Sequence, residues 1–320
     1  MRYAIVGAGA TGGFLGACLA RAGEDVTLIA RGPHLAAMRE RGITVQTPSG
    51  DSFTEHPECT DDMTAIAKAE AVFITLKAHS LPALAARLGD LLAPGAAFVS
   101  CQNGIPWWYA SGLESVDPGG EIAAAIPRSS VIGCVVYPAT SLTAPGVVAH
   151  QEGDRFSLGE LDGTRSERLQ EISAALVRAG LRAPIQKDLA PEIWLKLLGN
   201  ATFNPVSALT GATLAVMATE PAARELIRAL MSEVEAVAVA LGVRIPVSIE
   251  RRIDGAARVG DHRTSMLQDL ESGRPLELDA LTGAVIELAE RVKVPVPRLR
   301  VIDGATRLLV AERDRAHSRS

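Results

Sequence analysis

Short apolar runs alternate with stretches of helical periodicity through the first half of the chain. Each run is too short for a helix, whereas the stretches between them repeat their apolar residues at the spacing of a helix face. This alternation predicts parallel strands joined by crossover helices. The expected strands are Tyr3–Val6, Val26–Ile29, Ala71–Leu76 and Ala97–Cys101, and the expected helices are Gly12–Ala22, His34–Arg41 and Leu81–Leu92.

Two segments depart from this alternation. The residues around Pro48–Gly50 alternate in polarity on either side of a turn and predict a hairpin. Residues 131–158 are β-rich, with a turn at Pro145–Gly146, and predict antiparallel strands that extend the sheet. The stretch Thr164–Gly180 then predicts a helix, and residues 183–188 predict a last strand. The residues expected on the inner side of that helix are Leu169, Ile172, Leu176 and Val177.

After Asp188 the pattern becomes almost entirely helical. It includes a long amphipathic stretch, Pro221–Leu241. The 320 residues suffice for two domains, and the change of pattern places the boundary near Lys187. The prediction is an α/β fold: an N-terminal doubly wound domain with an antiparallel extension, residues 1–187, followed by an all-α C-terminal domain, residues 188–320.

One predicted helix, within residues 191–205, carries an unusual row of polar side chains. Lys196, Asn200 and Asn204 are four residues apart and fall along one side of a helix. The apolar residues that fall on another side, as a buried stripe, are Trp194, Leu197, Leu198 and Ala201. A solvated face is one interpretation of the polar row. A binding site is the other, because solvated rows usually mix Glu with Lys, whereas this row has two amides and one ammonium.

The first expected strand-to-helix turn has the spacing of a dinucleotide-binding loop. Gly7, Gly9 and Gly12 occupy the glycine positions of the G-x-G-x-x-G pattern. The first glycine permits a tight turn, the second lets the backbone approach a pyrophosphate, and the third lets the helix pack closely on the strand. The N–H groups at the helix N-terminus would bind the pyrophosphate. The expected cofactor-binding residues of this turn are Gly7, Ala8, Gly9, Ala10, Thr11 and Gly12.

Three further residues follow expected strands at the edge where such a sheet binds its cofactor. Arg31 ends the second strand, where an enzyme specific for NAD usually has Asp or Glu, and an arginine there can pair with the 2′-phosphate of NADP. Lys77 and Asn103 follow the next two strands, and their matching positions favour a shared cofactor crevice. Ordinary surface charge for Arg31 and Lys77, and turn formation for Asn103, are the alternatives. NADP(H) is the predicted cofactor.

Composition narrows the classes of function. A hydrophobic fraction of 48% indicates a globular protein, and a formal net charge of -5 argues against a dedicated nucleic-acid binder. No apolar run approaches the roughly 18 residues of a membrane span. The first residues run directly into a strand and a glycine turn, so we expect no cleaved signal. The four cysteines lack paired spacing, which indicates thiols in a reducing cytoplasm and no metal site.

Several motifs together resemble the ketopantoate reductase (2-dehydropantoate 2-reductase) family. The matching motifs are GAGATG, LIAR, TLKAH, QNG, PGVVAH, EIWLKLLGNATFNP and SMLQDLESGRPLELDALTG. They cover the chain from the first strand nearly to its end, in order. The resemblance implies a Rossmann-type domain joined to a helical domain. It also implies reduction of a small 2-oxo acid by NADPH, on the pathway to pantothenate and coenzyme A.

The resemblance further implies roles for individual residues. Lys196 matches the lysine that protonates or polarises the carbonyl oxygen of the substrate, and it is the predicted catalytic residue. A fixed ammonium suits that step, because negative charge builds on the oxygen as hydride reaches the carbon. Glu277 matches a cofactor-contacting glutamate near the nicotinamide ribose, and Asn103 matches an asparagine where cofactor and substrate meet. The implied substrate-binding residues are Asn103, Lys196, Asn200, Asn204 and Ser265.

Two features depart from the family pattern. Trp107, Trp108 and Tyr109 form a bulky insertion after Asn103, where they either pack or reshape the substrate pocket. Leu214 stands where some members carry a polar residue. Neither feature affects the cofactor prediction, but both leave the identity of the acyl chain of the substrate undetermined. Another branched or aromatic 2-oxo acid is therefore an alternative substrate. A non-catalytic NADP(H) sensor is the alternative from another class, and the sequence also leaves open a homodimer through the helical domain.

Overall fold

The chain forms two structural units in the computed structural model, which describes residues 1–317. The sheet unit comprises Met1–Gln102 and Gly120–Leu189. The helical unit comprises Asn103–Gly119 and the described residues from Ala190 onward. This division differs from the single boundary expected near Lys187, because residues 103–119 leave the sheet and pack with the helices before the chain returns. Residue 320, the expected end of the second domain, lies outside the described residues.

The sheet unit is built on a main sheet with the strand order β11-β8-β7-β6-β1-β2-β5. Its strands are β1 (Arg2–Val6), β2 (Asp25–Ile29), β5 (Glu58–Thr60), β6 (Ala71–Ile74), β7 (Ala97–Ser100), β8 (Val131–Val136) and β11 (Phe156–Glu160). β11 pairs antiparallel with β8, and the other neighbours pair parallel. Taken in chain order, the parallel strands have the doubly wound order 3-2-1-4-5-6 of dinucleotide-binding sheets. The predicted α/β class and its antiparallel extension are therefore confirmed.

A second sheet has the order β4-β3-β10-β9. Its strands are β3 (Ile43–Gln46), β4 (Ser52–Glu55), β9 (Ala139–Ala144) and β10 (Val147–Glu152). The hairpin predicted at Pro48–Gly50 is confirmed as β3 and β4. The prediction that all of residues 131–158 extend the main sheet is wrong for β9 and β10, because β10 pairs with β3. The strand predicted at residues 183–188 is also wrong: this segment forms a single isolated bridge, between Ile185 and Leu158, and Pro184 lacks the N–H that a ladder needs.

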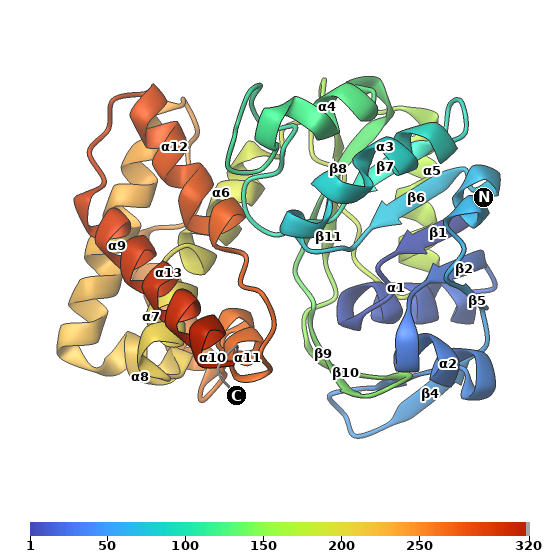
Figure 1. The fold of residues 1–320 in the computed structure, drawn as a ribbon, viewed down its shortest axis with the longest axis horizontal. Helices are drawn as coiled ribbons and strands as arrows, with labels where there is room; N and C mark the ends of the chain where they lie inside the picture. The colour runs from blue at the N-terminus through green and yellow to red at the C-terminus, as the bar shows by residue number, and fades with distance from the viewer. Residues whose placement is uncertain (318–320) are drawn as a thin grey trace. The chain divides into compact units, whose positions relative to one another are not determined.

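Helices cover both faces of the main sheet (Figure 1). They are α1 (Ala10–Arg21), α2 (Gly32–Arg41), α3 (Pro82–Leu91), α4 (Glu121–Ala125) and α5 (Glu167–Arg178). Successive side chains of β1 point to opposite faces. Tyr3 and Ile5 join the core shared with α1 and α5, while Ala4 and Val6 are buried on the face that carries α3. Burial on both faces explains why these strands read as continuous apolar runs.

The inner side of α5 differs from the prediction at one position. Leu169, Ile172 and Leu176 are buried, as expected. Val177 is instead 58% exposed. It follows Leu176 by one residue, so its side chain points about 100° away around the helix axis.

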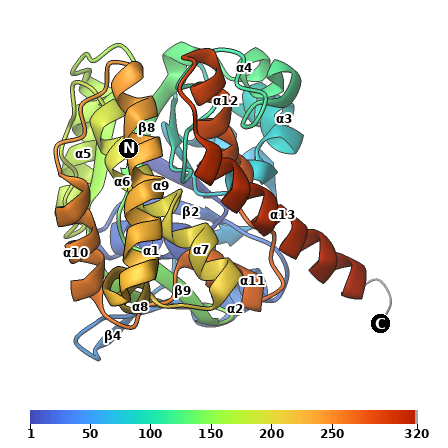
Figure 2. The same cartoon turned by 90° about the vertical axis from the view of Figure 1, so that its left-hand side faces the viewer.

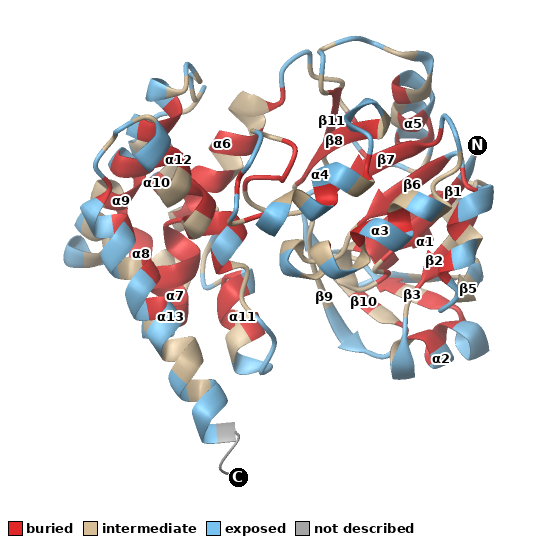
Figure 3. Ribbon diagram, turned by 45° about the horizontal axis from the view of Figure 1, so that its top comes forward, coloured by how far each residue is buried: buried red, intermediate tan, exposed pale blue. Residues whose placement is uncertain are grey.

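The helical unit packs around α9 (Pro221–Ala240), which confirms the amphipathic stretch predicted at Pro221–Leu241. The other helices are α6 (Ala190–Asn200), α7 (Phe203–Thr210), α8 (Leu214–Thr219), α10 (Ile249–Val259), α11 (Ser265–Glu271), α12 (Ala284–Arg291) and α13 (Pro297–His317). The buried stripe of α9 includes Ile227, Leu230, Met231, Val234 and Val237 (Figure 3). α13 packs against α7 and α9, and its C-terminal end extends beyond them (Figure 2). No helix within residues 1–317 combines the length and apolar character of a membrane span.

The helix predicted through residues 191–205 divides into α6 and α7. Its expected apolar stripe is confirmed, since Trp194, Leu197, Leu198 and Ala201 are all buried. The helix nevertheless ends at Asn200, because Pro205 cannot donate an N–H to the preceding turn. In a continuing helix the Thr202 N–H would donate to the Leu198 carbonyl oxygen. Here that oxygen accepts from the Thr202 hydroxyl at 2.7 Å, and the Thr202 N–H donates to the Gly199 carbonyl oxygen at 3.2 Å. Asn204 therefore lies on α7, and the prediction of three polar side chains along one helix is wrong.

Candidate active site

Backbone hydrogen bonds to β2 hold the glycine turn after β1 in shape. The N–H groups of Gly7 and Ala8 donate to the Ile29 carbonyl oxygen at 3.1 and 3.0 Å. Gly7 has a φ of 90°, a conformation that L side chains rarely adopt. α1 begins directly after Gly9, which provides no side-chain cap. The first N–H groups of α1 therefore lack partners within the helix and can bind an anionic pyrophosphate.

Gly12 and Gly9 serve different purposes in this turn. A Cβ on Gly12 would lie 2.3 Å from Thr75 Oγ1 and 2.7 Å from the Gly7 carbonyl oxygen. A Cβ on Gly9 would meet only the Gly7 carbonyl oxygen, at 3.8 Å. Gly12 thus lets α1 approach the sheet, whereas Gly9 leaves open space beside the backbone, as the approach of a cofactor requires.

Substitutions of these two glycines should separate folding from cofactor binding. Gly12→Ala is expected to lower the free energy of unfolding by about 1–3 kcal/mol, because its methyl group overpacks a close contact. Gly9→Ala is expected to keep the wild-type Tm and raise the Kd for NADPH about tenfold, because its methyl group occupies cofactor space. Thermal unfolding of the apoprotein and fluorescence titration with NADPH measure the two effects. Equal destabilisation by both substitutions would contradict this assignment.

Cationic residues flank the glycine turn at the same edge of the main sheet. Arg31 follows β2 as the exposed N-cap of α2, and half-buried Lys77 follows β6. Because β1 lies between β2 and β6, these residues stand on either side of the turn. Gln102, which the sequence analysis did not select, fastens this edge. Its Nε2 donates to the Ile74 carbonyl oxygen of β6 at 2.9 Å.

His34 braces the glycine turn from α2, and sequence reasoning also missed it. Its Nδ1 accepts a hydrogen bond from the Gly146 N–H at 2.9 Å. Its Nε2 therefore carries the proton and donates to the Ala8 carbonyl oxygen at 2.8 Å. Both contacts together require the neutral ring, and burial lowers the pKa of His34 below its ordinary value. The available signal in the sequence was a histidine in the first helical turn after Arg31.

Acid is expected to weaken the two hydrogen bonds of His34. The folded-state pKa of His34 is depressed, so the stability it contributes is complete above the unfolded value of 6.5 and is lost as the pH falls below it. The Tm of the wild type should therefore fall on acidification below this value. His34→Gln, which cannot titrate, should lower the free energy of unfolding by about 1 kcal/mol at neutral pH and flatten the acid dependence.

Thermal unfolding across a pH series measures the effect of His34. His79→Gln is the matched control, because His79 is exposed and lies outside the glycine turn. It should keep the acid dependence of the wild type. An equally steep fall in Tm for His34→Gln and the wild type would show that His34 is not the group responsible.

The helical unit brings Lys196 and Asn103 together. Lys196 lies on α6, and its Nζ donates to Asn103 Oδ1 at 2.6 Å. Both side chains are half-buried. An ammonium has three N–H donors, and this contact uses one of them. The amide oxygen therefore fixes the position of the ammonium.

The other predicted residues of this unit lie on neighbouring elements. Asn200 is the half-buried last residue of α6, and Asn204 is 5% exposed in the first turn of α7. α11, which begins with the exposed Ser265, packs against α7. Glu277 is half-buried and precedes a π-helical turn, Asp279–Gly283. Such turns are frequent at functional sites.

The aromatic insertion packs within the helical unit. Trp107 and Trp108 are buried, with exposed fractions of 6% and 7%. The Tyr109 hydroxyl accepts a hydrogen bond from Trp194 Nε1 at 2.7 Å. Of the two interpretations that the sequence left open for this insertion, the structure therefore favours packing.

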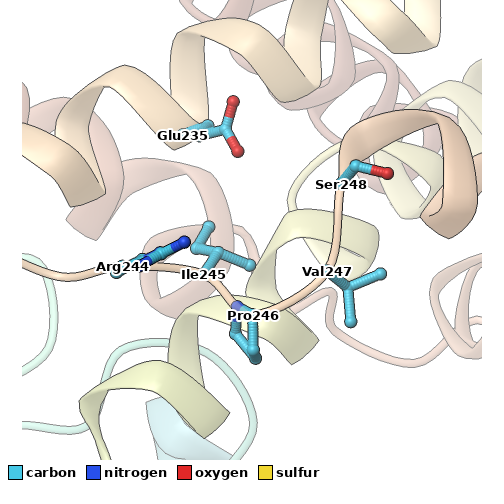
Figure 4. Close-up of a pocket in the computed structure, with 6 residues that line it drawn as sticks. All are labelled: Glu235, Arg244, Ile245, Pro246, Val247 and Ser248. Carbon is cyan, nitrogen blue, oxygen red and sulfur yellow. The ribbon is translucent and has the colours of Figure 1, made fainter.

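A separate pocket of about 500 Å³ lies on the helical unit, where Glu235 projects from α9 toward residues 244–248 (Figure 4). Its lining residues are Glu235, Arg244, Ile245, Pro246, Val247 and Ser248. This lining includes no predicted site residue, and Arg244 and Ser248 are exposed. We therefore assign the pocket no part in the active site. Within residues 1–317, no group of three or more His, Cys, Asp and Glu is placed to hold a metal ion.

These features define a class of protein. The doubly wound sheet, the glycine turn before an uncapped helix and the arginine after β2 are features typical of a dinucleotide-binding site. The ammonium fixed by an amide suits a reaction in which hydride builds negative charge on a carbonyl oxygen. The class is the nicotinamide-dependent oxidoreductases.

Comparison with known proteins identifies the family. Residues 3–163 match the family model described as ketopantoate reductase PanE/ApbA, and residues 188–309 match the model of its C-terminal part. A 2-dehydropantoate 2-reductase from Mesorhizobium japonicum is 45% identical, over 98% of this chain and 99% of that protein. One from Halobacterium salinarum is 29% identical, over 98% of this chain and 100% of that protein. The crystal structure of a PanE/ApbA family ketopantoate reductase from Ralstonia eutropha has a TM-score of 0.86 at 28% identity, and the match covers 98% of this chain and 100% of that one.

The chain belongs to the ketopantoate reductase family. The predicted family, fold class and NADP(H) cofactor are thereby confirmed, as is the predicted class of oxidoreductase acting on CH–OH groups. The roles of the individual site residues remain predictions.

Proposed function

We propose that this chain reduces 2-dehydropantoate (ketopantoate) to pantoate with NADPH, as a step toward pantothenate and coenzyme A. The observation that carries the proposal is the contact between Lys196 Nζ and Asn103 Oδ1, 2.6 Å long, which fixes an ammonium in a chain of this family. The 45% identity to a 2-dehydropantoate 2-reductase over nearly the whole chain supports ketopantoate as the substrate.

The sheet unit has the features that NADPH requires. The turn Gly7–Gly12 offers backbone N–H groups to the pyrophosphate, and the open space beside Gly9 leaves room for it. Arg31 would pair with the 2′-phosphate. NADPH supplies the hydride when it is bound. The proposed cofactor contacts are Gly7, Ala8, Gly9, Ala10, Thr11, Gly12, Arg31, Lys77, Asn103 and Glu277.

The helical unit supplies the proton and the proposed substrate contacts. The Lys196 ammonium stabilises the oxyanion that forms at the carbonyl, more strongly in the transition state than in the ground state. It then donates a proton to that oxygen as general acid. Asn103 holds the ammonium in place. The amides of Asn200 and Asn204 and the hydroxyl of Ser265 can donate hydrogen bonds to the oxygens of the substrate.

A panel of 2-oxo acids tests the substrate. The kcat/KM of the purified protein with NADPH is compared for ketopantoate, a straight-chain acid, a smaller branched acid and an aromatic acid. Ketopantoate is expected to give the highest value, by about tenfold or more. A higher value for the smaller branched acid or the aromatic acid would assign another substrate to the same chemistry.

A homodimer through the helical unit is a further part of the proposal. Its support is an apolar pair on α13: Val301 is 68% exposed and Leu308 is 61% exposed. They are one heptad apart and lie on the same side of the helix. Light scattering that gives twice the chain mass of 33.6 kDa would support the dimer, and a single chain mass would overturn it.

The cytoplasm is the proposed location. The buried thiols of Cys18, Cys101 and Cys134 suit a reducing compartment. Cell fractionation tests this, and recovery of the protein outside the cytoplasmic fraction would contradict it.

A further inference from the structure

Residues 103–119, here called the crossing segment, join two elements of the sheet unit but pack with the helices. Two side chains near the start of the segment contact α6. Asn103 Oδ1 accepts from Lys196 Nζ at 2.6 Å, and the Tyr109 hydroxyl accepts from Trp194 Nε1 at 2.7 Å. Trp194 and Lys196 lie within one turn of the same helix. The crossing segment is thus attached at two nearby points to the helix that bears the proposed acid.

The contact between Tyr109 and Trp194 combines a buried hydrogen bond with ring packing. Trp194 has an exposed fraction of 0%, so its indole N–H depends on a partner within the protein. The two rings also pack edge to face, with centroids 6.3 Å apart. Loss of the Tyr109 hydroxyl would leave a buried donor without this acceptor, which costs more than losing an exposed hydrogen bond.

Other contacts attach the crossing segment to the C-terminal helices. The Ile105 N–H donates to the Ala280 carbonyl oxygen in the π-helical turn at 2.8 Å. Farther along, the Glu287 carboxylate on α12 accepts from the N–H groups of Glu114 and Ser115 at 3.1 and 3.0 Å. These contacts hold the segment on the unit, whereas Tyr109 holds it on α6. Tyr109 and Asn103 are thus the two side chains of the crossing segment shown to hydrogen-bond to α6.

We infer that Tyr109 is a positioning residue of the reductase: through Trp194 it holds the crossing segment on α6, so that Asn103 fixes the Lys196 ammonium. The inference rests on the role proposed above for Lys196. A lysine side chain has a flexible four-carbon stem, so its charge is placed accurately only where an acceptor holds it. Misplacement of a reacting group by about 1 Å can cost about 100-fold in rate. On this inference the aromatic insertion acts on the reaction through Asn103 and Lys196.

Tyr109→Phe tests the inference, because it removes one oxygen atom and keeps the ring. We expect kcat to fall about tenfold while the Kd for NADPH stays within about twofold of the wild type. Tyr137→Phe is the matched control in the sheet unit, where the Tyr137 ring stacks on the Arg155 guanidinium at 3.9 Å. It should leave both kcat and the Kd for NADPH unchanged.

A double-mutant cycle with Asn103→Ala distinguishes positioning from structural support. If Tyr109 acts through Asn103, adding Tyr109→Phe to Asn103→Ala should change kcat by less than about twofold. An equal tenfold loss in both backgrounds would overturn the inference. A wild-type kcat for Tyr109→Phe would overturn it too, as would a parallel loss of Tm and NADPH affinity.

Lys196→Ala separates failure of the inference from failure of the proposed mechanism. Full activity of Lys196→Ala would contradict the proposed role of Lys196 as general acid. The inference about Tyr109 would then lose its basis. An inactive Lys196→Ala together with a fully active Tyr109→Phe would overturn the inference alone. An inactive Lys196→Ala with a tenfold slower Tyr109→Phe supports both.

Discussion

Lys196→Ala is expected to lower kcat/KM for ketopantoate by about 10³-fold or more, with the Kd for NADPH unchanged. General acid catalysis is typically worth about 10² to 10⁴-fold, and the ammonium also stabilises the developing oxyanion. The structure gives the substitution a second consequence, since Asn103 loses the donor that contacts its Oδ1 at 2.6 Å. Steady-state kinetics with ketopantoate and fluorescence titration with NADPH measure the two quantities.

Lys68→Ala is the matched control for this prediction. Lys68 is exposed at the end of a 3₁₀ turn in the sheet unit. Its loss removes the same charge from the chain and should leave kcat/KM within about twofold of the wild type. If the kcat/KM of Lys196→Ala equalled that of Lys68→Ala, Lys196 would not be the general acid. The proton would then have to come from another group.

Arg31→Gln is expected to raise the KM for NADPH about 10- to 100-fold and to leave the KM for NADH nearly unchanged. The charged hydrogen bonds of an arginine to a phosphate are worth about 1.5–3 kcal/mol, which corresponds to this change in affinity. NADH lacks the 2′-phosphate and so loses no partner. Kinetics with both cofactors measure the change in their ratio.

Arg41→Gln is the matched control, because Arg41 is exposed at the other end of α2. It should leave the preference for NADPH intact. Equal losses with NADPH and NADH in Arg31→Gln would point to a structural role for Arg31. An unchanged preference would make Arg31 ordinary surface charge, the alternative that the sequence left open.

Local sequence patterns predicted the central strands of the sheet unit, but they did not predict strands whose pairing partners are distant in the sequence. β1, β2, β6 and β7 follow from apolar runs, because strands buried on both faces must be apolar throughout. Nothing in the sequence near β10 indicates that it pairs with β3, so the second sheet was missed. β5 is short and mostly polar, and its place beside β2 was missed for the same reason. The break between α6 and α7 could have been predicted, because Pro205 gives a local signal.

The same distinction applies to the candidate site. The glycine turn is a local motif, so its geometry follows from spacing alone. Lys196 and Asn103 are separated by 93 residues, and only the family resemblance indicated that they act together. His34 and Gln102 were not selected, because each acts on a backbone group that tertiary packing brings to it. Tyr109 was noted as part of the aromatic insertion, but its hydrogen bond to Trp194 could not be predicted for the same reason. An isolated polar residue carries no signal of such a partner.

The central claim is tested most directly by NADPH oxidation with ketopantoate, with the product identified and counted. The account predicts rapid oxidation that depends on ketopantoate, with pantoate formed in equimolar amount to the NADPH consumed. Tight binding of NADPH without such turnover, with the other 2-oxo acids also inert, would contradict the account and favour an NADP(H) sensor.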